Sequence, residues 1–374
     1  MNQTDRIAEL KRLGQSVWLD QIDRDMLRTG RLERLRDIGV TGITANPTIF
    51  AKALESSDAY AGDIARRFDR GQEAESSVWD LLIVDVQSAA DVFRPVFDRE
   101  HGHDGFVSIE VSPEIAGDTD KTIAAARDLR ERVRRPNVMV KIPATPSGLA
   151  AIEAMIAEGA NINVTLIFGV ERYVKVVEAF LAGLERFSAN GGDPTQVQSV
   201  ASFFVSRVDT KVDERLNKKM TEAEGPRRAA LQKLLGKAAI ANSRLAYEIF
   251  SQLHFGPRWD RLRDDGASVQ RCLWASTSTK NPSYRDTMYV EELIGPATVN
   301  TMPVSTLEAF LDHGRVGLTL QKDVEGARHV LDELAANGID LAAITQELED
   351  EGVAGFARSF RESIDHLRKV RSPR

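Results

Sequence analysis

Residues 137–168 read NVMVKIPATPSGLAAIEAMIAEGANINVTLIF, a stretch in which two short apolar segments flank helix-like sequence. The flanking segments, NVMVKIP (137–143) and NINVTLIF (161–168), have the length and apolar character of buried strands. A strand, a helix and a second strand form a right-handed crossover in which both strands run parallel. The stretch therefore predicts an α/β protein with a parallel sheet.

The same alternation extends in both directions along the chain. Eight strand–helix units predict a (β/α)8 TIM barrel, because an open doubly wound sheet would need fewer. Neither a glycine-rich dinucleotide fingerprint nor a GxxxxGK phosphate loop follows any of these strands, which argues against an open nucleotide-binding sheet. The predicted strands are SVWLD (16–20), VTGITAN (40–46), FVSIEVSP (106–113), NVMVKIP (137–143), NINVTLIF (161–168), VQSVASFFV (197–205), RCLWAST (271–277) and ATVNTMP (297–303).

Two connections are longer than the others. Residues 47–105, after the second strand, and residues 206–270, after the sixth, each contain more than one predicted helix. The most loop-like sequence within them is NKKMTEAEGPRR (217–228). Since no linker, repeat or low-complexity tract divides the chain, we expect a single barrel domain over residues 1–374, with extra helices in both connections.

The composition excludes several classes of protein. Of 374 residues, 42% are hydrophobic, and 49 Lys+Arg against 56 Asp+Glu give a net charge of −7, which argues against nucleic acid or an anionic membrane as a partner. One cysteine, Cys272, excludes an intrachain disulfide and a cysteine-rich metal cluster, and we expect it to be a small core residue. No apolar run approaches the ~20 residues of a membrane span, and the first residues are polar. We therefore expect a cytoplasmic enzyme.

Polar residues interrupt the apolar pattern where five of the predicted strands end. Those that share a strand are two residues apart, and period-two geometry places each such pair on one face of its strand. In a barrel the carboxyl ends of the strands form the rim on which active sites are built. The rim set comprises Asp20, Thr44, Asn46, Ser108, Glu110, Lys141, Asn163 and Thr165.

Each of these residues also has a structural explanation when taken singly. A lysine at a strand end can extend to water, and a glutamate can be an ion-pair partner. An Asn or Thr there commonly completes a turn or caps a helix, and Asn46 before Pro47 fits that pattern. Their joint occurrence on five strands favours a site, because buried ionisable groups are costly unless they interact.

A lysine between apolar neighbours, with carboxylates nearby, suits Schiff-base chemistry. Desolvation can bring a lysine pKa towards ~7–8, which frees the amine to attack a ketone. The resulting iminium accepts electrons from the adjacent carbon–carbon bond, so that aldol cleavage proceeds with neither a metal nor an organic cofactor. The six His are scattered, and we interpret HGHD (101–104) as a solvated loop, so no metal site is predicted.

Hydroxyls and cations after the sixth and seventh strands indicate a phosphate site. ASFFVSRVD (201–209) carries Ser202, Ser206 and Arg207, and WASTSTKNP (274–282) carries Ser276 and Lys280. Such groups on barrel loops commonly bind phosphate. Arg207 could also be a first-turn helix residue with a solvated head group. The basic tail HLRKVRSPR (366–374) is interpreted as a frayed, solvated end.

An ordered set of segments resembles the transaldolases, class I aldolases of the pentose phosphate pathway. The resemblance extends from about residue 17 to residue 303 and is closest to the longer transaldolase subclass, as distinct from the short fructose-6-phosphate aldolase-like enzymes. The segments are VWLDQI, GITANPTIF, SIEVSP, VMVKIPAT, INVTLIF, ASFFVSRVD and WASTSTKNPSYRDTMYVEELIGPATVNTMP.

The resemblance implies catalytic roles position by position. Lys141 in VKIPAT matches the Schiff-base lysine. Glu110 in SIEVSP matches the acid/base that works through a water during imine formation, and Thr165 in NVTLIF helps to hold that water. Asp20 matches the general base at the carbon–carbon bond that breaks.

The resemblance also implies substrate contacts. Thr277 and Ser278 follow Ser276, whereas the short enzymes have Phe and then Arg at these positions, so Lys280 is the expected replacement for the missing cation. Asn46 and Asn163 match residues that orient the dihydroxyacetone hydroxyls, with Thr44 and Ser108 beside them, and Arg207, Ser202 and Ser276 match the phosphate clamp, with Phe204 lining the same pocket.

The implied reaction moves a dihydroxyacetone unit from sedoheptulose 7-phosphate or fructose 6-phosphate to glyceraldehyde 3-phosphate or erythrose 4-phosphate. The expected partners are therefore sugar phosphates, and both a monomer and a homodimer are compatible with the sequence. One alternative is a lyase of the fructose-6-phosphate aldolase type, which releases free dihydroxyacetone. The other is a catalytically silent barrel that only binds sugar phosphates.

Overall fold

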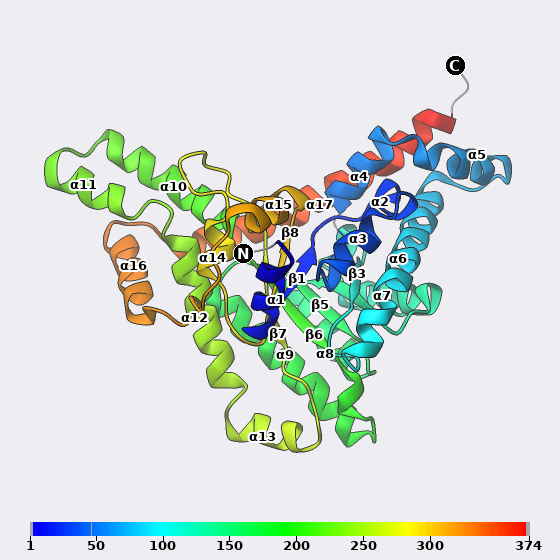
Figure 1. Cartoon of the computed structure of the whole chain (residues 1–374), viewed down its shortest axis with the longest axis horizontal. Coiled ribbons are helices and arrows are strands. Elements are labelled where there is room, and N and C mark those ends of the chain that lie inside the picture. The colour runs from blue at the N-terminus through cyan, green and yellow to red at the C-terminus, as the bar shows by residue number, and fades with distance from the viewer. Residues whose placement is uncertain (1–2, 46, 372–374) are drawn as a thin grey trace.

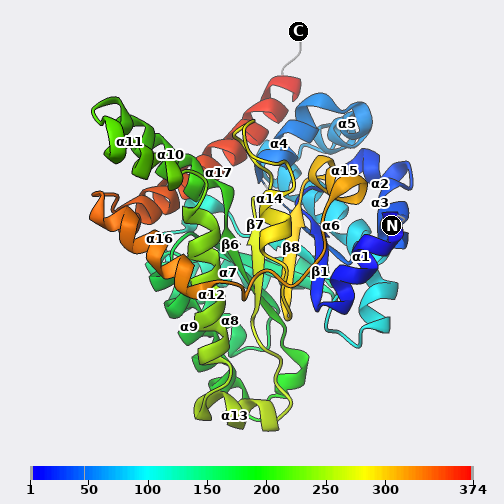
Figure 2. The ribbon, with the colours of Figure 1, turned by 60° about the vertical axis from the view of Figure 1, so that its left-hand side comes forward.

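A closed barrel of eight parallel strands forms the centre of the molecule. The structure is a computed structural model that describes residues 3–45 and 47–371. The strands pair in chain order from β1 to β8, and β8 closes on β1 (Figures 1 and 2). The predicted (β/α)8 fold is confirmed. The strands are β1 (Gln15–Leu19), β2 (Gly42–Thr44), β3 (Val107–Glu110), β4 (Val138–Pro143), β5 (Ile162–Ile167), β6 (Ser199–Phe204), β7 (Arg271–Ala275) and β8 (Thr298–Met302).

Helices surround the barrel and alternate with its strands, as the periodicity predicts. The side chain of Asp118 caps the first turn of one of them, α7, by accepting a hydrogen bond from the Lys121 N–H. Before β8, the helices outside the two long connections are α1 (Gln3–Arg12), α2 (Arg24–Arg28), α3 (Arg31–Asp37), α7 (Thr119–Val133), α8 (Pro146–Ile156), α9 (Val170–Ala189) and α14 (Met288–Glu292), with short 3-10 turns η2 (Pro113–Ile115) and η3 (Pro194–Gln196).

Both long connections contain the extra helices that were predicted. The loop expected over 217–228 is largely wrong, because only residues 222–224 separate two helices there. The β2–β3 connection holds α4 (Pro47–Ser56), η1 (Asp58–Tyr60), α5 (Ala61–Asp69) and α6 (Ala74–Arg99). The β6–β7 connection holds α10 (Ser206–Thr221), α11 (Gly225–Lys233), α12 (Ala238–Leu253) and α13 (Pro257–Asp264).

Three further helices follow β8, and the last of them crosses the barrel. They are α15 (Val304–His313), α16 (Val324–Ala336) and α17 (Leu341–Arg371). Figure 1 shows α17, in red, at the same end of the barrel as α4 and α10, whereas α13 lies at the opposite end. A Cβ on Gly352 of α17 would lie 2.9 Å from the Leu166 side chain at the carboxyl end of β5. The expectation of a frayed tail from residue 366 is therefore wrong as far as Arg371, since Leu367 is fully buried.

A buried polar contact lies towards the opposite end of the barrel. Asp104 accepts hydrogen bonds from Ser16 Oγ at 2.5 Å and Trp18 Nε1 at 2.9 Å. The interpretation of residues 101–104 as a solvated loop holds for the exposed His101 and His103 but not for Asp104, because these donors stabilise its carboxylate inside. Within residues 3–45 and 47–371, no group of three or more His, Cys, Asp or Glu could hold a metal ion.

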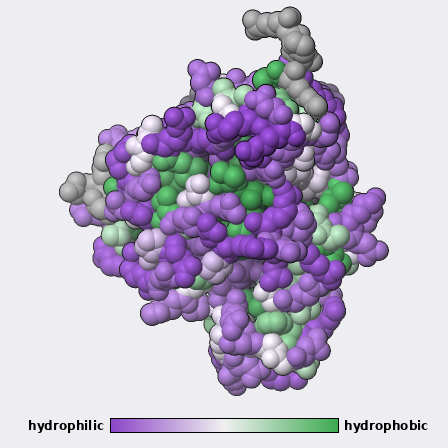
Figure 3. Space-filling model, turned by 90° about the vertical axis from the view of Figure 1, so that its right-hand side faces the viewer, coloured by the Kyte–Doolittle hydropathy of each residue, from purple (hydrophilic) through white to green (hydrophobic). Residues whose placement is uncertain are grey.

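The outer surface is dominated by charged side chains. Figure 3 shows one face as largely hydrophilic, with hydrophobic areas in its hollowed parts. Arg132 and Arg135 of the α7 end, for example, pair with Asp80 and Asp91 of α6 at 2.7 and 2.6 Å. In the part of the chain that the structure describes, no helix is long and apolar enough to cross a membrane. Cys272, as expected, is buried in the core, with its sulfur 3.3 Å from the Tyr173 hydroxyl.

Candidate active site

A buried ion pair joins two neighbouring strands at the carboxyl end of the barrel. The register of β3 and β4 places Glu110 opposite Lys141, and Lys141 Nζ lies 3.0 Å from Glu110 Oε2. The Glu110 side chain is only 3% exposed, and that of Lys141 only 6%. Burial raises the pKa of the Glu110 carboxyl, and the charge of Lys141 opposes that rise. The pair can therefore exchange a proton at a site shielded from water.

Asp20 lies at the end of β1, on the same rim. Its backbone N–H donates to Met302 O at 3.1 Å, which ties the end of β1 to β8. Burial raises the pKa of Asp20 to about 6, while the charges of Lys280 and Lys141 lower it. Such a pKa is suited to a general base that works near neutral pH.

Most of the predicted site residues line one cavity of about 280 Å³. Its lining combines two of the three charged catalytic candidates, Lys141 and Asp20, with the further cations Arg207 and Lys280 and several hydroxyls. Three side-chain atoms, Asp20 Oδ1, Glu110 Oε1 and Thr165 Oγ1, are buried without a hydrogen-bond partner among the residues that the structure describes. The predicted residues in the lining are Asp20, Thr44, Lys141, Thr165, Ser202, Phe204, Arg207, Ser276 and Lys280.

The remaining predicted residues do not line this cavity or are outside the described residues. Asn163 Nδ2 donates to Ser108 Oγ at 2.9 Å, and Ser202 Oγ donates to Asn163 Oδ1 at 2.7 Å. Asn163 and Ser108 are fully buried, and Glu110 is nearly so. In this arrangement the only hydroxyl hydrogen of Ser202 is engaged in the hydrogen bond to Asn163, so the hydroxyl must turn before it can donate to a ligand in the cavity. The predicted role of Asn46 concerns a residue outside those described.

Arg207 and Ser276, two of the residues expected to bind phosphate, both line the cavity. Arg207 is in the first turn of α10, with its guanidinium carbon 5.4 Å from the centre of the Phe204 ring. Burial lowers the pKa of Arg207, and the charge of Glu351 raises it. Ser276 has a φ of +57°, and its Oγ is 2.9 Å from Ser206 Oγ. Two adjacent loops therefore present a cation and hydroxyls to one position.

Lys280 is the exposed member of this group. Its Nζ donates to Ser278 Oγ at 2.7 Å. Its loop, between β7 and α14, is fastened to α10 by Tyr284, whose hydroxyl donates to Asp213 at 2.5 Å. A second tyrosine, Tyr289, donates to the buried Asp209 at 2.8 Å. These bonds hold the loop of Lys280 beside the helix of Arg207.

Two further residues near Lys141 and Asp20 were not predicted: one lines the cavity, and the other lies beside the Lys141 amine. Thr301 of β8 lines the cavity, and Thr301 Oγ1 lies 3.0 Å from Thr44 Oγ1. Its position near the end of a predicted strand is the signal that could have identified it. Phe356 of α17 places its ring centre 5.6 Å from Lys141 Nζ. Helical periodicity predicts that Phe356 is apolar and buried but not which strand it covers.

Comparison with known proteins identifies the family. A family model described as Transaldolase/Fructose-6-phosphate aldolase matches residues 17–367. The chain belongs to this family. Two curated transaldolases are similar over nearly their whole length: that of Acidothermus cellulolyticus is 51% identical over 361 residues (96% of this chain, 95% of the relative), and that of Parafrankia sp. is 48% identical over 365 residues (97% of each).

A third similar transaldolase, from Thermobifida fusca, is 48% identical over 363 residues, which cover 96% of this chain and 97% of the relative. The prediction from the sequence of a transaldolase, and hence of a transferase, is confirmed by these matches. The rim of polar residues described above is thus the candidate active site of a chain in the transaldolase family.

Proposed function

We propose that this protein transfers a dihydroxyacetone unit from sedoheptulose 7-phosphate or fructose 6-phosphate to glyceraldehyde 3-phosphate or erythrose 4-phosphate, through a Schiff base on Lys141. The main support is the Lys141–Glu110 pair, buried at 3.0 Å and placed where Lys141 also lines a cavity shared with Asp20. This reaction belongs to the non-oxidative pentose phosphate pathway.

Imine formation requires a proton acceptor and donor beside the amine. Lys141 gives a proton to Glu110, and the free Nζ attacks the ketone carbon to form a carbinolamine. Glu110, whose pKa burial raises, returns the proton to the departing hydroxyl, and water leaves as the iminium forms. The hydroxyl of Thr165, also without an internal partner among the described residues, can position that water.

Cleavage requires a base at the far side of the substrate. The Asp20 carboxylate takes the proton of the hydroxyl on the carbon beyond the bond to be broken. That oxygen becomes the carbonyl of the departing aldose, and the electrons of the carbon–carbon bond move into the iminium to give an enamine. The enamine then attacks the acceptor aldehyde, and Asp20 returns the proton to the new hydroxyl.

A transferase must hold the enamine until an acceptor arrives. The burial of Lys141, with the Phe356 ring 5.6 Å from its Nζ, supports transfer over release because it restricts water. The alternative lyase predicts release of free dihydroxyacetone from fructose 6-phosphate without an acceptor. Coupled assays with and without erythrose 4-phosphate separate the two, and release that is equally fast in both would favour the lyase. The non-catalytic barrel predicts no covalent intermediate at all.

We expect Arg207→Met to weaken the use of phosphorylated donors. A charged hydrogen bond to phosphate contributes about 1.5–3 kcal/mol, so kcat/KM for fructose 6-phosphate should fall by roughly 10- to 100-fold. Unphosphorylated fructose should be affected much less, and steady-state assays of both donors measure the difference. Lys280→Met is the matched comparison, with a smaller effect expected because Lys280 is exposed. Equal losses with both donors would contradict the assigned phosphate site.

The pH dependence of cleavage should report the ionisation of Asp20. Because its pKa is raised to about 6 and the carboxylate is the active form, kcat/KM should fall about 10-fold per pH unit below pH 6. Stopped assays with fructose 6-phosphate and erythrose 4-phosphate between pH 5 and 8 test this. A profile that stays flat down to pH 5 would exclude Asp20 as the base.

We further propose that the protein works in the cytoplasm, as one catalytic domain over residues 1–374, without metal or organic cofactor. The single cysteine and the net charge of −7 are consistent with that setting. The expected partners are the sugar phosphates themselves, with neither nucleic acid nor membrane involved.

A further inference from the structure

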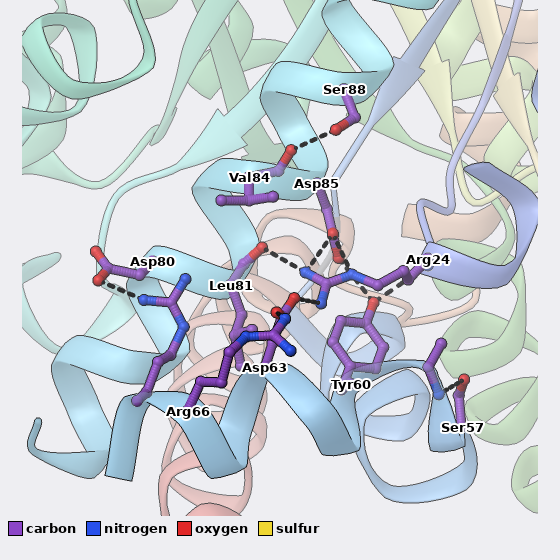
Figure 4. A network of polar contacts seen from close by, with 12 residues as sticks. Arg24, Ser57, Tyr60, Asp63, Arg66, Asp80, Leu81, Val84, Asp85 and Ser88 are labelled. Carbon is purple, nitrogen blue, oxygen red and sulfur yellow. Dashed lines mark hydrogen bonds and ion pairs between the residues drawn. The ribbon is translucent and has the colours of Figure 1, made fainter. Parts of the chain in front are cut away.

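A buried polar network lies immediately after the loop that carries Asp20. Arg24, the first residue of α2, extends its side chain between α5 and α6, and Figure 4 shows its guanidinium between Asp85 and Asp63, with the Tyr60 ring alongside. Arg24 and Asp85 have side chains only 8% and 2% exposed. Asp85 lies in α6, so the pair joins the segment after β1 to the long β2–β3 connection.

Arg24 is held through both its side chain and its backbone. Its Nε and Nη2 donate to Asp85 Oδ1 at 2.8 and 2.7 Å, and its Nη1 donates to Asp63 at 2.5 Å. Tyr60 bridges the two ends, because its hydroxyl accepts from the backbone N–H of Arg24 at 3.2 Å and donates to Asp85 Oδ2 at 2.8 Å. The position of the chain at Arg24 is therefore fixed against α6.

The Asp20 side chain lacks a comparable support of its own. Its Oδ1 is buried and accepts no hydrogen bond from any of the residues described. The backbone of Asp20 is fixed on one side by its bond to Met302 O. On the other side Ile22 is buried in the core, and Arg24 is the next residue held by buried charged hydrogen bonds. The direction of the carboxylate consequently depends on how the backbone between these points is held.

We propose that Arg24 and Asp85 are positioning residues for Asp20, which hold the loop after β1 so that its carboxylate faces the bond to be cleaved. Buried ion pairs are often replaceable by apolar residues without loss of stability, and their geometry can instead specify one arrangement. The pair would thus connect the extra helices of the β2–β3 connection to the base. The inference rests on the proposed role of Asp20 as that base.

The test measures imine formation and cleavage separately in the double variant Arg24→Met/Asp85→Leu. Both members of the ion pair are replaced, so neither leaves the other as an unpaired buried charge. With fructose 6-phosphate and borohydride, we expect Lys141 to be modified to the wild-type extent in total, with a larger share of the adduct carrying the uncleaved fructose 6-phosphate. The rate of cleavage should fall by roughly 10- to 100-fold, as for a misplaced catalytic group. Arg24→Lys, which keeps the charge, should recover part of that loss. Wild-type cleavage in the double variant, or equal losses of adduct and cleavage, would overturn the proposal.

A control pair and an independent readout complete the design. Arg258 and Glu185 form a more exposed, bidentate pair, at 2.8 and 2.9 Å, in the α13 region at the opposite end of the barrel, so Arg258→Met/Glu185→Leu should leave cleavage unchanged. The titration of Asp20, from carboxyl carbon NMR difference spectra against Asp20→Asn, needs no turnover. If the pair positions Asp20, its pKa should move away from the wild-type value in the Arg24→Met/Asp85→Leu variant. An unchanged Asp20 titration would overturn the positioning role of Arg24 and Asp85, whether or not the protein forms a Schiff base. A missing Lys141 adduct in the wild type would instead overturn the proposed function.

Discussion

Lys141→Met is expected to abolish the covalent intermediate and to lower kcat/KM by at least about 10⁴-fold, because methionine fills a similar volume but has no amine to attack the ketone. The measurement is borohydride reduction in the presence of fructose 6-phosphate, followed by peptide mass spectrometry. The wild type should carry a dihydroxyacetone adduct on Lys141, and the variant should carry none. An unmodified Lys141 in the wild type, or an adduct on another lysine, would contradict the mechanism.

The variant needs a control for folding because Lys141 is the ion-pair partner of Glu110. Removing one member of a buried pair leaves an unpaired charge, at a cost of about 3–5 kcal/mol if it stays ionised. Burial already raises the pKa of Glu110, so we expect it to become protonated in the variant and to reduce that cost. The double variant Lys141→Met/Glu110→Gln removes both charges. It should fold with near wild-type cooperativity and remain inactive, whereas Lys280→Met should retain the adduct.

The barrel and its rim were predictable because both depend on short-range periodicity. Alternation with period two puts Ser108 and Glu110 on one face of β3, and parallel register then brings Glu110 opposite Lys141. The pairing of β1 with β8 closes the barrel and includes the hydrogen bond from Asp20 N–H to Met302 O. Closure therefore places Asp20 on the same rim as Lys141. No long-range information is needed for these steps beyond the count of strands.

Features that depend on packing between distant segments were not predictable. Nothing in the local sequence indicates that α17 crosses the barrel or that Phe356 reaches Lys141. The donation from Ser202 to Asn163 depends on the register of β5 and β6, which shifts between Val164 and Ile167. The buried Asp104 could not be distinguished from a solvated loop residue, because its donors lie almost ninety residues earlier in the chain. Tertiary contacts decide each of these cases.

Asp20→Asn is expected to uncouple cleavage from imine formation. The amide keeps the shape of the side chain but cannot accept the proton of the substrate hydroxyl, so cleavage should slow by about 10²- to 10⁴-fold. Lys141 should still be modified, but by the uncleaved fructose 6-phosphate instead of dihydroxyacetone, since Glu110 serves imine formation. Single-turnover cleavage and borohydride trapping measure the two steps separately. Loss of the adduct in Asp20→Asn would show that Asp20, and not Glu110 alone, works in imine formation.

The same substitution should stabilise the protein at alkaline pH. The folded state raises the pKa of Asp20 from 3.8 to about 6, so the unfolded chain binds fewer protons between these values and stability falls as the pH rises through them. At 1.36 kcal/mol per pH unit, the ionised carboxylate costs about 3 kcal/mol above pH 6 and almost nothing below pH 4. Thermal unfolding of both proteins should give Asp20→Asn the higher Tm at pH 8 and similar values at pH 4. An Asn variant that is less stable at pH 8 would mean that Lys141 and Lys280 stabilise the carboxylate more than burial penalises it. The Asp20 carboxylate would then have a low pKa and would stabilise the fold as a structural ion pair. Its pKa would no longer support its assignment as a catalytic base.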